Sequence, residues 1–263
     1  MAYEDIIYEK MDHIARITFN RPRYLNAMRG QTMTEFIEAC HDAAHDHQVG
    51  VVVITGAGNR AFSTGGDVKW ERDIGAGTNW GPKIDFYRCV RLIPKPVIAA
   101  VRGYCIGGSN VLAAVCDLTI ASENALFGQV GPRMGSFNAL GTAYLTRVVG
   151  EKKAREMWFL CKQYNAKEAL EMGLVNKVVP DDKLEAEVNA WCQEILKLSP
   201  SALSAVKLHF NADSERLMSM MDIGMHAVGL YQSGPEAQEG LNAFLEKRTP
   251  DFWKLRSKTV GLQ

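Results

Sequence analysis

Net charge and long apolar runs are what this sequence lacks. Its 263 residues include 30 lysines and arginines and 30 aspartates and glutamates, so the formal net charge is zero. Balanced charge excludes a global attraction to nucleic acid or to an anionic membrane. No apolar run reaches the length of a membrane span, and the first residues lack the charged-then-apolar pattern of a signal peptide. We therefore expect a soluble cytoplasmic protein that binds neither nucleic acid nor a membrane.

The sequence also lacks paired cysteines, internal repeats and low-complexity segments. Its six cysteines have no C-x-x-C spacing, which predicts buried free thiols in a reducing compartment. His41 and His45 have the i,i+4 spacing of a helical metal site. We interpret them as a solvated helix surface and expect no metal. The length allows one large domain, or a domain with an appendage.

Apolar patterning predicts alternating strands and helices. Residues 6–10 and 13–19 form an expected hairpin, and residues 32–47 an amphipathic helix. The β-branched runs 51–55 and 96–101 predict buried strands, the first of them covered on both faces. Further strands are expected at 118–121 and 125–127, a mobile loop containing Trp80 at 74–82, and helices at 84–92, 111–115, 143–149, 152–161, 166–172, 184–198, 201–211, 213–231 and 235–247.

Two glycine-centred segments follow the buried strands: residues 62–67 (Phe-Ser-Thr-Gly-Gly-Asp) and 103–110 (Gly-Tyr-Cys-Ile-Gly-Gly-Ser-Asn). Each is expected to be a turn in which the chain leaves a buried strand and enters a helix. Glycine there lets a backbone N–H approach a ligand without a Cβ atom in the way. Two N–H groups aimed at one point form an oxyanion hole, which stabilises negative charge on a carbonyl oxygen.

These segments belong to a longer pattern that resembles the crotonase (enoyl-CoA hydratase/isomerase) superfamily over nearly the whole chain. The pattern comprises Arg21-Pro22, Leu25-Asn26-Ala27, residues 62–67, Lys95-Pro96-Val97-Ile98-Ala99, residues 103–108, Cys116-Asp117 and Gly173-Leu174-Val175. The resemblance implies an α/β fold with a ββα-spiral catalytic core at residues 1–200. It also implies a helical trimerisation region at 201–263, which would build a trimer or a dimer of trimers.

By the same resemblance, the N–H groups of Gly66 and Gly108 hold the thioester oxygen of a coenzyme A substrate as an enolate. Each such donor contributes on the order of 10²–10³ in rate. Glycines in a single turn are more simply turn formers, but two within this pattern favour the functional interpretation. Hydratases of the superfamily carry two glutamates that activate and protonate water, and these positions are Val111 and Gly131 here. Neither side chain transfers a proton, which disfavours the standard hydratase mechanism.

A narrower similarity covers residues 127–137, 147–158 and 161–164. It is a similarity to 1,4-dihydroxy-2-naphthoyl-CoA synthase and 2-ketocyclohexanecarboxyl-CoA hydrolase, which make or break a C–C bond on a cyclic acyl-CoA. In synthases with glycine at the position of Gly131, bound bicarbonate acts as base, and its holders match Gln129 and Trp158. The similarity implies a bicarbonate-sized anion and no tightly bound cofactor. The alternative is an ordinary turn amide and a core aromatic ring.

Three more residues match substrate-binding or acid–base positions of these relatives. Ser136 matches a serine that hydrogen-bonds the substrate, although a supporting polar side chain is the simpler interpretation. Asn138 stands where both relatives carry an aspartate, and asparagine cannot exchange a proton at neutral pH. Either that role has moved to water, bicarbonate or a tyrosine, or the reaction differs. Tyr231 matches a tyrosine that reaches the active site of the hydrolase, but exposed helix tyrosines are equally common.

The resemblance also implies contacts with coenzyme A, as part of the substrate. The expected substrate or coenzyme A contacts are Arg23, Leu25, Ala27, Ser63, Gly65, Asp67, Val68, Phe244 and Lys247. Asp67 is at the same time a natural turn and helix-capping residue. Phe244 and Lys247 would approach the nucleotide from a neighbouring subunit. A cation such as Lys247 suits the phosphates of the nucleotide. Lys247 is otherwise a solvated charge.

The sequence leaves three functions open. The first is an acyl-CoA enzyme that forms or cleaves a C–C bond beside an enolate, on a cyclic or aromatic-derived substrate. The second is a hydratase or isomerase with a non-standard acid–base set, because Asn138 departs from the C–C bond class. The third is a catalytically weak CoA-binding scaffold, because the sequence shows no obvious proton-transferring carboxylate.

Overall fold

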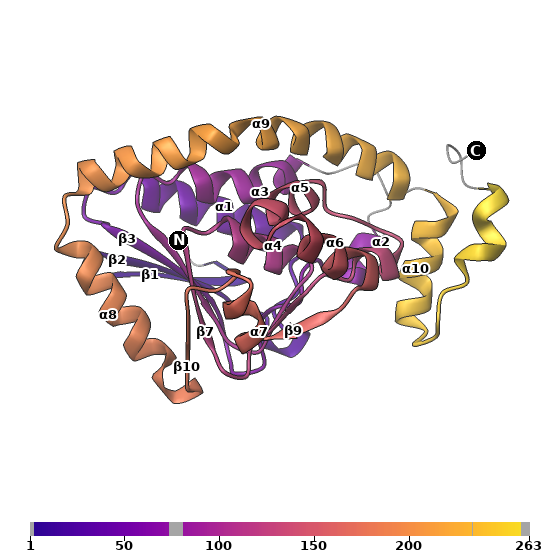
Figure 1. Ribbon diagram of the computed structural model, residues 1–263, viewed down its shortest axis with the longest axis horizontal. Coiled ribbons are helices and arrows are strands. Elements are labelled where there is room, and N and C mark those ends of the chain that lie inside the picture. Colours follow the sequence, from indigo (N-terminus) through magenta and orange to yellow (C-terminus); the bar gives the residue numbers. More distant parts are fainter. Residues whose placement is uncertain (1–2, 74–80, 233, 259–263) are drawn as a thin grey trace.

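The computed structural model describes residues 3–73, 81–232 and 234–258, which form two β-sheets surrounded by helices (Figure 1). The first sheet has the order β1-β2-β3-β5-β7-β10 and the second the order β4-β6-β8-β9. Neighbouring strands are parallel except β1 with β2 and β8 with β9. The strands are β1 (Ile6–Met11), β2 (Ile14–Phe19), β3 (Val51–Gly56), β4 (Ala61–Ser63), β5 (Val97–Val101), β6 (Tyr104–Ile106), β7 (Leu118–Ser122), β8 (Leu126–Gly128), β9 (Gln163–Asn165) and β10 (Lys177–Val179).

The core repeats one path: a strand in the first sheet, a strand in the second, then a helix. The repeats are β3-β4-α2, β5-β6-α4 and β7-β8 followed by η2 and α5. This confirms the expected α/β fold of ββα units. The helices are η1 (Pro22–Tyr24), α1 (Gly30–His45), α2 (Val68–Asp73), α3 (Gly81–Leu92), α4 (Gly108–Val115), η2 (Gly131–Met134), α5 (Ala139–Val149), α6 (Glu151–Leu160), α7 (Ala166–Glu171), η3 (Asp181–Lys183), α8 (Leu184–Leu196), α9 (Pro200–Gln232), α10 (Pro235–Leu245) and η4 (Phe252–Lys258).

Strand β3 sends alternate side chains into two apolar cores. Val52 and Ile54 join the larger core, to which α1, α3 and α4 contribute. Val51 and Val53 pack in a smaller core with Val188 of α8. All are fully buried, which confirms that this strand is covered on both faces, as parallel sheets usually are.

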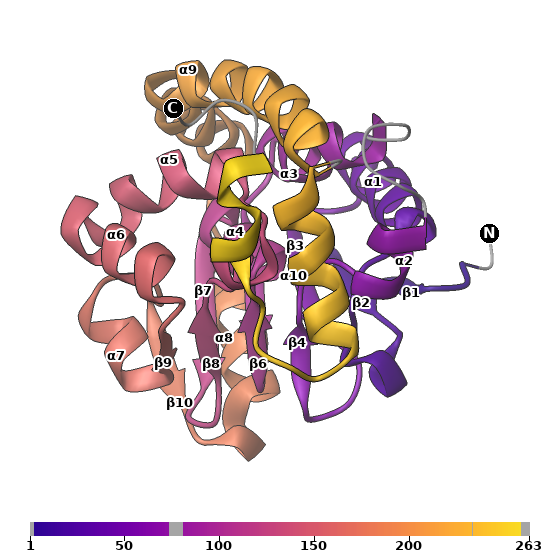
Figure 2. The same ribbon diagram turned by 90° about the vertical axis from the view of Figure 1, so that its right-hand side faces the viewer.

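Helix α9 runs along one side of the molecule, beside α3 and α5 (Figure 1, Figure 2). The expected break between 201–211 and 213–231 is wrong, because α9 is continuous. Asn211, at the expected break, donates Nδ2–H to the Arg91 carbonyl (2.8 Å), and its own carbonyl accepts from Arg91 Nη2 (3.1 Å). These contacts with α3 outweigh the low helix propensity of asparagine.

The glycine segments differ from the expected simple turns. Strand β4 lies partly within residues 62–67, and β6 lies within residues 103–110. Each glycine turn therefore follows a short strand of the second sheet, not the long buried strand directly. Strands β9 and β10 were also missed, because three residues carry too little alternation to be recognised.

Several other expectations concern single features. All six cysteines are buried and unpaired, as expected. Within the described ranges, no helix is long and apolar enough to cross a bilayer. Of the expected loop 74–82, residues 74–80 with Trp80 lie outside the described residues, and α3 already begins at Gly81. The division into a core and an oligomerisation region stays a prediction, and its boundary coincides with the start of α9.

Candidate active site

A cavity of about 890 Å³ opens between the two glycine segments, η2 and α10. In Figure 2, α10 crosses this region next to α2. Most of the residues selected from the sequence line it. They are Arg23, Leu25, Ala27, Gly65, Gly66, Asp67, Val68, Gly108, Gln129, Gly131, Ser136, Asn138, Trp158 and Phe244.

The first glycine segment is held by the chain at residues 25–28. Met28 N donates to the Gly65 carbonyl (2.8 Å), and Asp67 N donates to the Met28 carbonyl (2.8 Å). These two bonds lie on either side of Gly66 and fix the orientation of its peptide. They also bring Leu25 and the residues after it to the same cavity wall.

The second glycine segment starts a helix. Gly107 has a φ of +65°, and α4 begins at Gly108. The N–H of Gly108 lies in the first turn of α4, where a helix provides no acceptor of its own. Ser109 donates its hydroxyl to the carbonyls of Ser63 and Ile106, which ties the second segment to the first.

Gly65 and Gly108 meet where the two segments touch. A Cβ atom at Gly65, whose φ is +86°, would lie 3.0 Å from Gly108 N. Gly66 and Gly108 therefore lie in one cavity wall, which is the arrangement that two oxyanion donors require. Their catalytic role stays a prediction.

Gln129 and Trp158 each place an unpaired donor in the protein interior. Gln129 is 1% exposed and Trp158 5%. Gln129 Nε2 and Trp158 Nε1 have no hydrogen-bond partner among the described residues. A buried N–H without an acceptor costs about 1–3 kcal/mol, so both groups suit the oxygen atoms of a bound anion or water. Gly131 beside them has no room for a side chain, because a Cβ atom would lie 2.7 Å from the Ser136 carbonyl oxygen.

Asn138 caps α5 and faces Tyr87 of α3. Its Oδ1 accepts from Gly141 N (2.7 Å), and its Nδ2 donates to Tyr87 Oη (3.0 Å). Tyr87 is 7% exposed and donates its hydroxyl to the Gly108 carbonyl (3.2 Å). Burial raises the pKa of Tyr87, the Asn138 hydrogen bond lowers it less, and the charge on Glu71 raises it further. Tyr87 is therefore a neutral phenol beside the second glycine segment.

Three selected residues, Ser63, Tyr231 and Lys247, do not line the cavity. Fully buried Ser63 instead accepts from Gly65 N at 3.2 Å and so supports the first glycine segment. The ring of Tyr231 contacts the ring of Phe137 edge-on, with ring centroids 6.1 Å apart, and its hydroxyl donates to a carboxylate on α10. Phe244, which was expected from a neighbouring subunit, lines the cavity of its own chain.

The Tyr231 hydroxyl donates to Glu236 Oε2, and the two oxygen atoms are 3.1 Å apart. Burial and this neighbouring carboxylate raise the pKa of Tyr231 to about 12. Tyr231 is not among the lining residues, and its expected role as an acid that reaches the substrate stays a prediction.

Glu71 and Tyr87 line the cavity but were not selected from the sequence. Side chains of a helix tilt toward its N-terminus, so Glu71 in α2 points back over the first glycine segment. A Cβ atom at Gly66 would lie 2.3 Å from Glu71 Oε1. Helical periodicity after the glycine turn was the available signal for Glu71. Tyr87 carries no such signal, because its position depends on the packing of α3 against α4.

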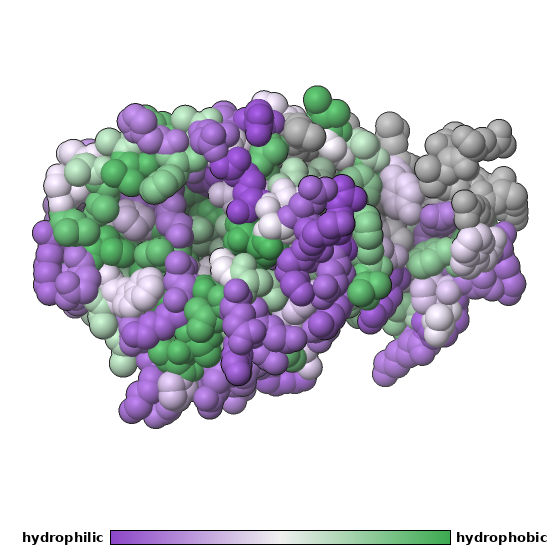
Figure 3. Space-filling view, in the orientation of Figure 1, coloured by the Kyte–Doolittle hydropathy of each residue, from purple (hydrophilic) through white to green (hydrophobic). Residues whose placement is uncertain are grey.

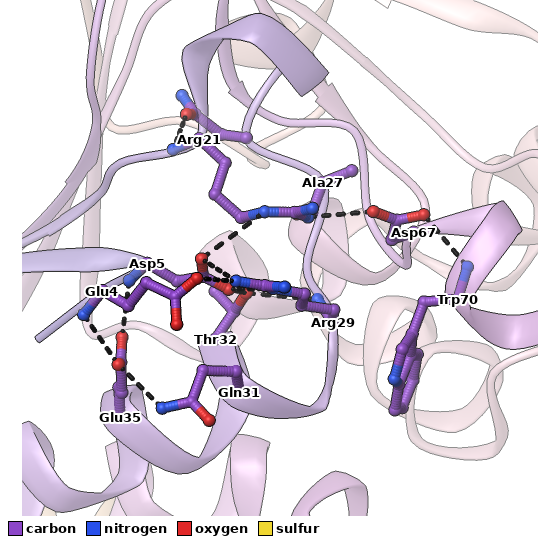
Figure 4. Close-up of polar contacts among 11 residues, drawn as sticks. Glu4, Asp5, Arg21, Ala27, Arg29, Gln31, Thr32, Glu35, Asp67 and Trp70 are labelled. Atoms are coloured by element: carbon purple, nitrogen blue, oxygen red, sulfur yellow. Dashed lines mark hydrogen bonds and ion pairs between the residues drawn. The ribbon is translucent and has the colours of Figure 1, made fainter. Parts of the chain in front are cut away.

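An ion-pair network anchors the start of α2 (Figure 4). Asp67 Oδ1 accepts from Trp70 N (3.1 Å), which confirms its capping role, and Oδ2 pairs with Arg21 Nη1 (3.0 Å). Arg21 also pairs with Asp5 (3.6 Å), which accepts from Arg29 Nε (2.7 Å). Burial acts to raise the pKa of Asp5, but hydrogen bonds, first from Arg29, and the arginine charges lower it below its usual value.

Known proteins with similar sequences and structures place this site in a family. Residues 9–255 match the sequence model of the family Enoyl-CoA hydratase/isomerase. An enoyl-CoA hydratase from Mycobacterium avium subsp. paratuberculosis K-10 is 30% identical, with a TM-score of 0.87 over 95% of this chain and 99% of that chain. An enoyl-CoA hydratase/isomerase from Xanthobacter autotrophicus Py2 is 32% identical, with a TM-score of 0.83 over 94% and 98%. A methylmalonyl-CoA decarboxylase in complex with 2-nitronate-propionyl-CoA is 26% identical, with a TM-score of 0.84 over 95% and 99%.

The family match extends over nearly the whole chain, and it agrees with the ββα core and with the cavity between two glycine segments. The chain belongs to the enoyl-CoA hydratase/isomerase family, and is thus a crotonase-superfamily acyl-CoA enzyme.

Proposed function

We propose that this protein holds a thioester enolate between the N–H groups of Gly66 and Gly108, and forms or cleaves a C–C bond on a cyclic or aromatic-derived acyl-CoA. The observation that carries the proposal is the contact of the two glycine segments at one cavity wall. Claisen and reverse-Claisen steps both pass through an enolate, whose negative oxygen needs two such preorganised donors.

The two usual hydratase positions support a reaction other than simple hydration. Val111 is fully buried, and a Cβ atom at Gly141 would lie 2.5 Å from its Cγ2, so this position is packed against α5. Gly131 is closed by the Ser136 carbonyl. Neither position presents a carboxylate that would activate water.

Bicarbonate fits the donor set at Gln129 and Trp158. In the proposal, Gln129 Nε2 and Trp158 Nε1 donate to its oxygen atoms, which satisfies both buried N–H groups. Neither side chain titrates at neutral pH, so both only bind and orient the anion. When bound, bicarbonate supplies a base.

We assign coenzyme A to the part of the cavity lined by Arg23, Leu25, Ala27 and Phe244. Arg60 and Arg133 line the same cavity, and guanidinium groups suit phosphate oxygens. Lys247 is not itself a lining residue, although its N–H donates to the Phe244 carbonyl (3.1 Å), and it is not needed for this assignment.

We also propose that the chain assembles as a cytoplasmic homotrimer or a dimer of trimers. Large apolar side chains are exposed on α9, where Leu208 is 68% and Phe210 75% exposed, and on α6, where Phe159 is 72% exposed. On the face in Figure 3, apolar residues form separate patches among polar ones. The molar mass measured by light scattering during size-exclusion chromatography distinguishes a trimer and a hexamer from a monomer.

A hydratase or isomerase is the second candidate. Two of the similar structures above carry such names. Glu71 supports this candidate directly, because it places a carboxylate against Gly66 that the usual positions lack.

Substrate assays test the proposal. Purified protein is incubated with a cyclic β-ketoacyl-CoA and with an aryl-succinyl-CoA, each with and without bicarbonate, and products are followed by mass spectrometry. In a third assay it is incubated with an enoyl-CoA, whose conjugated-thioester absorbance is followed. Hydrolytic ring opening or condensation supports C–C bond chemistry. Loss of enoyl-thioester absorbance with no activity on the other substrates supports the hydratase instead, and CoA binding without any turnover supports the scaffold.

A further inference from the structure

A carboxylate lies directly against the first proposed oxyanion donor. A Cβ atom at Gly66 would be 2.3 Å from Oε1 of Glu71 and 2.8 Å from its Cδ. Both residues line the cavity. Glu71 is thus within reach of the carbon bonded to a thioester carbonyl whose oxygen is held at Gly66, since that carbon is only two bonds from the oxygen.

The position of Glu71 is determined by contacts on both sides of α2. Its N–H donates to the Asp67 carbonyl (2.8 Å), and Asp67 is anchored by Arg21 (Figure 4). The neighbouring Trp70 ring packs on α1, where a Cβ atom at Gly30 would lie 2.8 Å from Trp70 Cζ2. A carboxylate on a short, docked helix is preorganised for proton transfer in a way that a loop residue is not.

We propose that Glu71 exchanges a proton with the α-carbon of the acyl group; this rests on the oxyanion hole proposed above. Glu71 takes the proton, and the C–H electron pair becomes the enolate, whose negative oxygen accepts from Gly66 and Gly108 N–H. In the reverse step the enolate carbon takes the proton back. The site carries one negative charge throughout, because Glu71 becomes neutral as the thioester oxygen becomes charged. Two anions side by side would otherwise repel each other.

Solvent-exchange measurements on phenylacetyl-CoA test this proposal, because this thioester has an acidic α-carbon and no β-keto group to cleave. The protein is incubated in D₂O, and deuterium at the α-carbon is measured by mass spectrometry. We expect exchange by the unaltered protein and a loss of about 10²–10⁴-fold in Glu71→Gln, with the Kd for phenylacetyl-CoA changed less than about threefold. The matched control is Asp73→Asn, which removes an exposed carboxylate of the same helix, at 45% side-chain exposure, and should exchange normally.

A smaller variant gives an independent readout if Glu71→Gln disturbs α2. In Glu71→Ala, added formate should restore part of the exchange, since it replaces the missing carboxylate; the same formate should not affect Asp73→Asn. Unchanged exchange in Glu71→Gln overturns the proposal. Tighter binding of phenylacetyl-CoA and faster exchange in Glu71→Gln would also overturn it, because Glu71 would then only obstruct the oxyanion hole. Absence of exchange by unaltered protein that binds the probe also overturns it.

These outcomes are separable from failure of the proposed function. Exchange on phenylacetyl-CoA involves no C–C bond, so Glu71 can be supported while ring-opening and condensation assays are negative. The converse result is that Glu71→Gln turns over a cyclic β-ketoacyl-CoA as fast as the unaltered protein does. That result would support the C–C bond chemistry and overturn the role of Glu71.

Discussion

Asn138 donates its amide N–H to the hydroxyl oxygen of Tyr87 at 3.0 Å. The amide orientation is set by its other end, because Oδ1 accepts from Gly141 N and caps α5. The Tyr87 hydroxyl must then donate elsewhere, and it does so to the Gly108 carbonyl. Asn138 thus positions the Tyr87 hydroxyl, which lies beside the second glycine segment.

Substitutions at Asn138 separate its two bonds. Asn138→Asp keeps the capping acceptor and should change the free energy of unfolding by less than about 0.5 kcal/mol, whereas Asn138→Leu should lose about 1–2 kcal/mol. Urea unfolding measures both. Equal losses in the two variants would show that the cap contributes nothing.

The N–H of Gly108 can be removed with little disturbance of α4. Gly108 is the first residue of that helix, a position that accepts proline. A Cβ atom there would lie 2.9 Å from Tyr87 Oη, so Gly108→Ala is the control that introduces the same Cβ contact and keeps the N–H. We expect turnover by Gly108→Pro to be about 10²–10³ below that of Gly108→Ala. Similar rates for the two variants would rule out Gly108 N–H as an oxyanion donor.

Trp158→Phe deletes the buried donor together with the five-membered ring that carries it, and keeps an aromatic side chain at this position. If Trp158 Nε1 holds an anion, as proposed, bicarbonate should accelerate turnover by the unaltered protein but not by Trp158→Phe. If no anion binds, bicarbonate should affect the rates of the parent and of the variant alike, and the variant should differ from the parent only by the smaller volume of its side chain in the core. Rates measured across a bicarbonate titration decide between the two.

Acid sensitivity follows from the lowered pKa of Asp5. A carboxylate with a lower pKa in the folded than in the unfolded chain stabilises the fold above the unfolded pKa of about 4, and this stability is lost as the pH falls through the folded pKa. Because Asp5 is 3% exposed and paired with arginines, Asp5→Asn should lose about 3 kcal/mol at pH 7. The difference from the parent should shrink below pH 4. Urea unfolding at pH 7, 5, 4 and 3 tests this, with Asp46→Asn as the more exposed control.

Lys207 attaches α9 to the first sheet. It is 7% exposed and donates to Asp117 Oδ2 (2.7 Å) and to the carbonyls of Val90 and Lys95. Lys207→Met leaves these acceptors without their cation and should destabilise the fold by about 3–5 kcal/mol. Lys197→Met, which removes an exposed ion pair, should lose less than about 1 kcal/mol. A small effect at Lys207, measured by thermal or urea unfolding, would mean that the other contacts of α9, including those between Asn211 and Arg91, hold it without this ion pair.

Local patterns predicted the elements whose cause is local. The β-branched run at β3 predicted a strand buried on both faces, and Val51 to Ile54 are indeed fully buried. Asp67 was expected to cap a helix, and it does. The matching pattern at Tyr231 says nothing about Phe137, whose ring contacts it, and Tyr231 is not among the residues that line the cavity. The break expected near Asn211 was wrong because the contact with Arg91 is distant in the sequence.

The residue types of the site were therefore evident in the sequence itself: two glycine segments, no glutamate at Val111 or Gly131, and an asparagine in place of an aspartate. Only the tertiary structure brought Glu71 against Gly66 and Tyr87 against Gly108. Those approaches depend on how α2 docks on α1 and how α3 packs on α4. Such packing is the sum of many weak contacts between segments far apart along the chain, which no local pattern encodes.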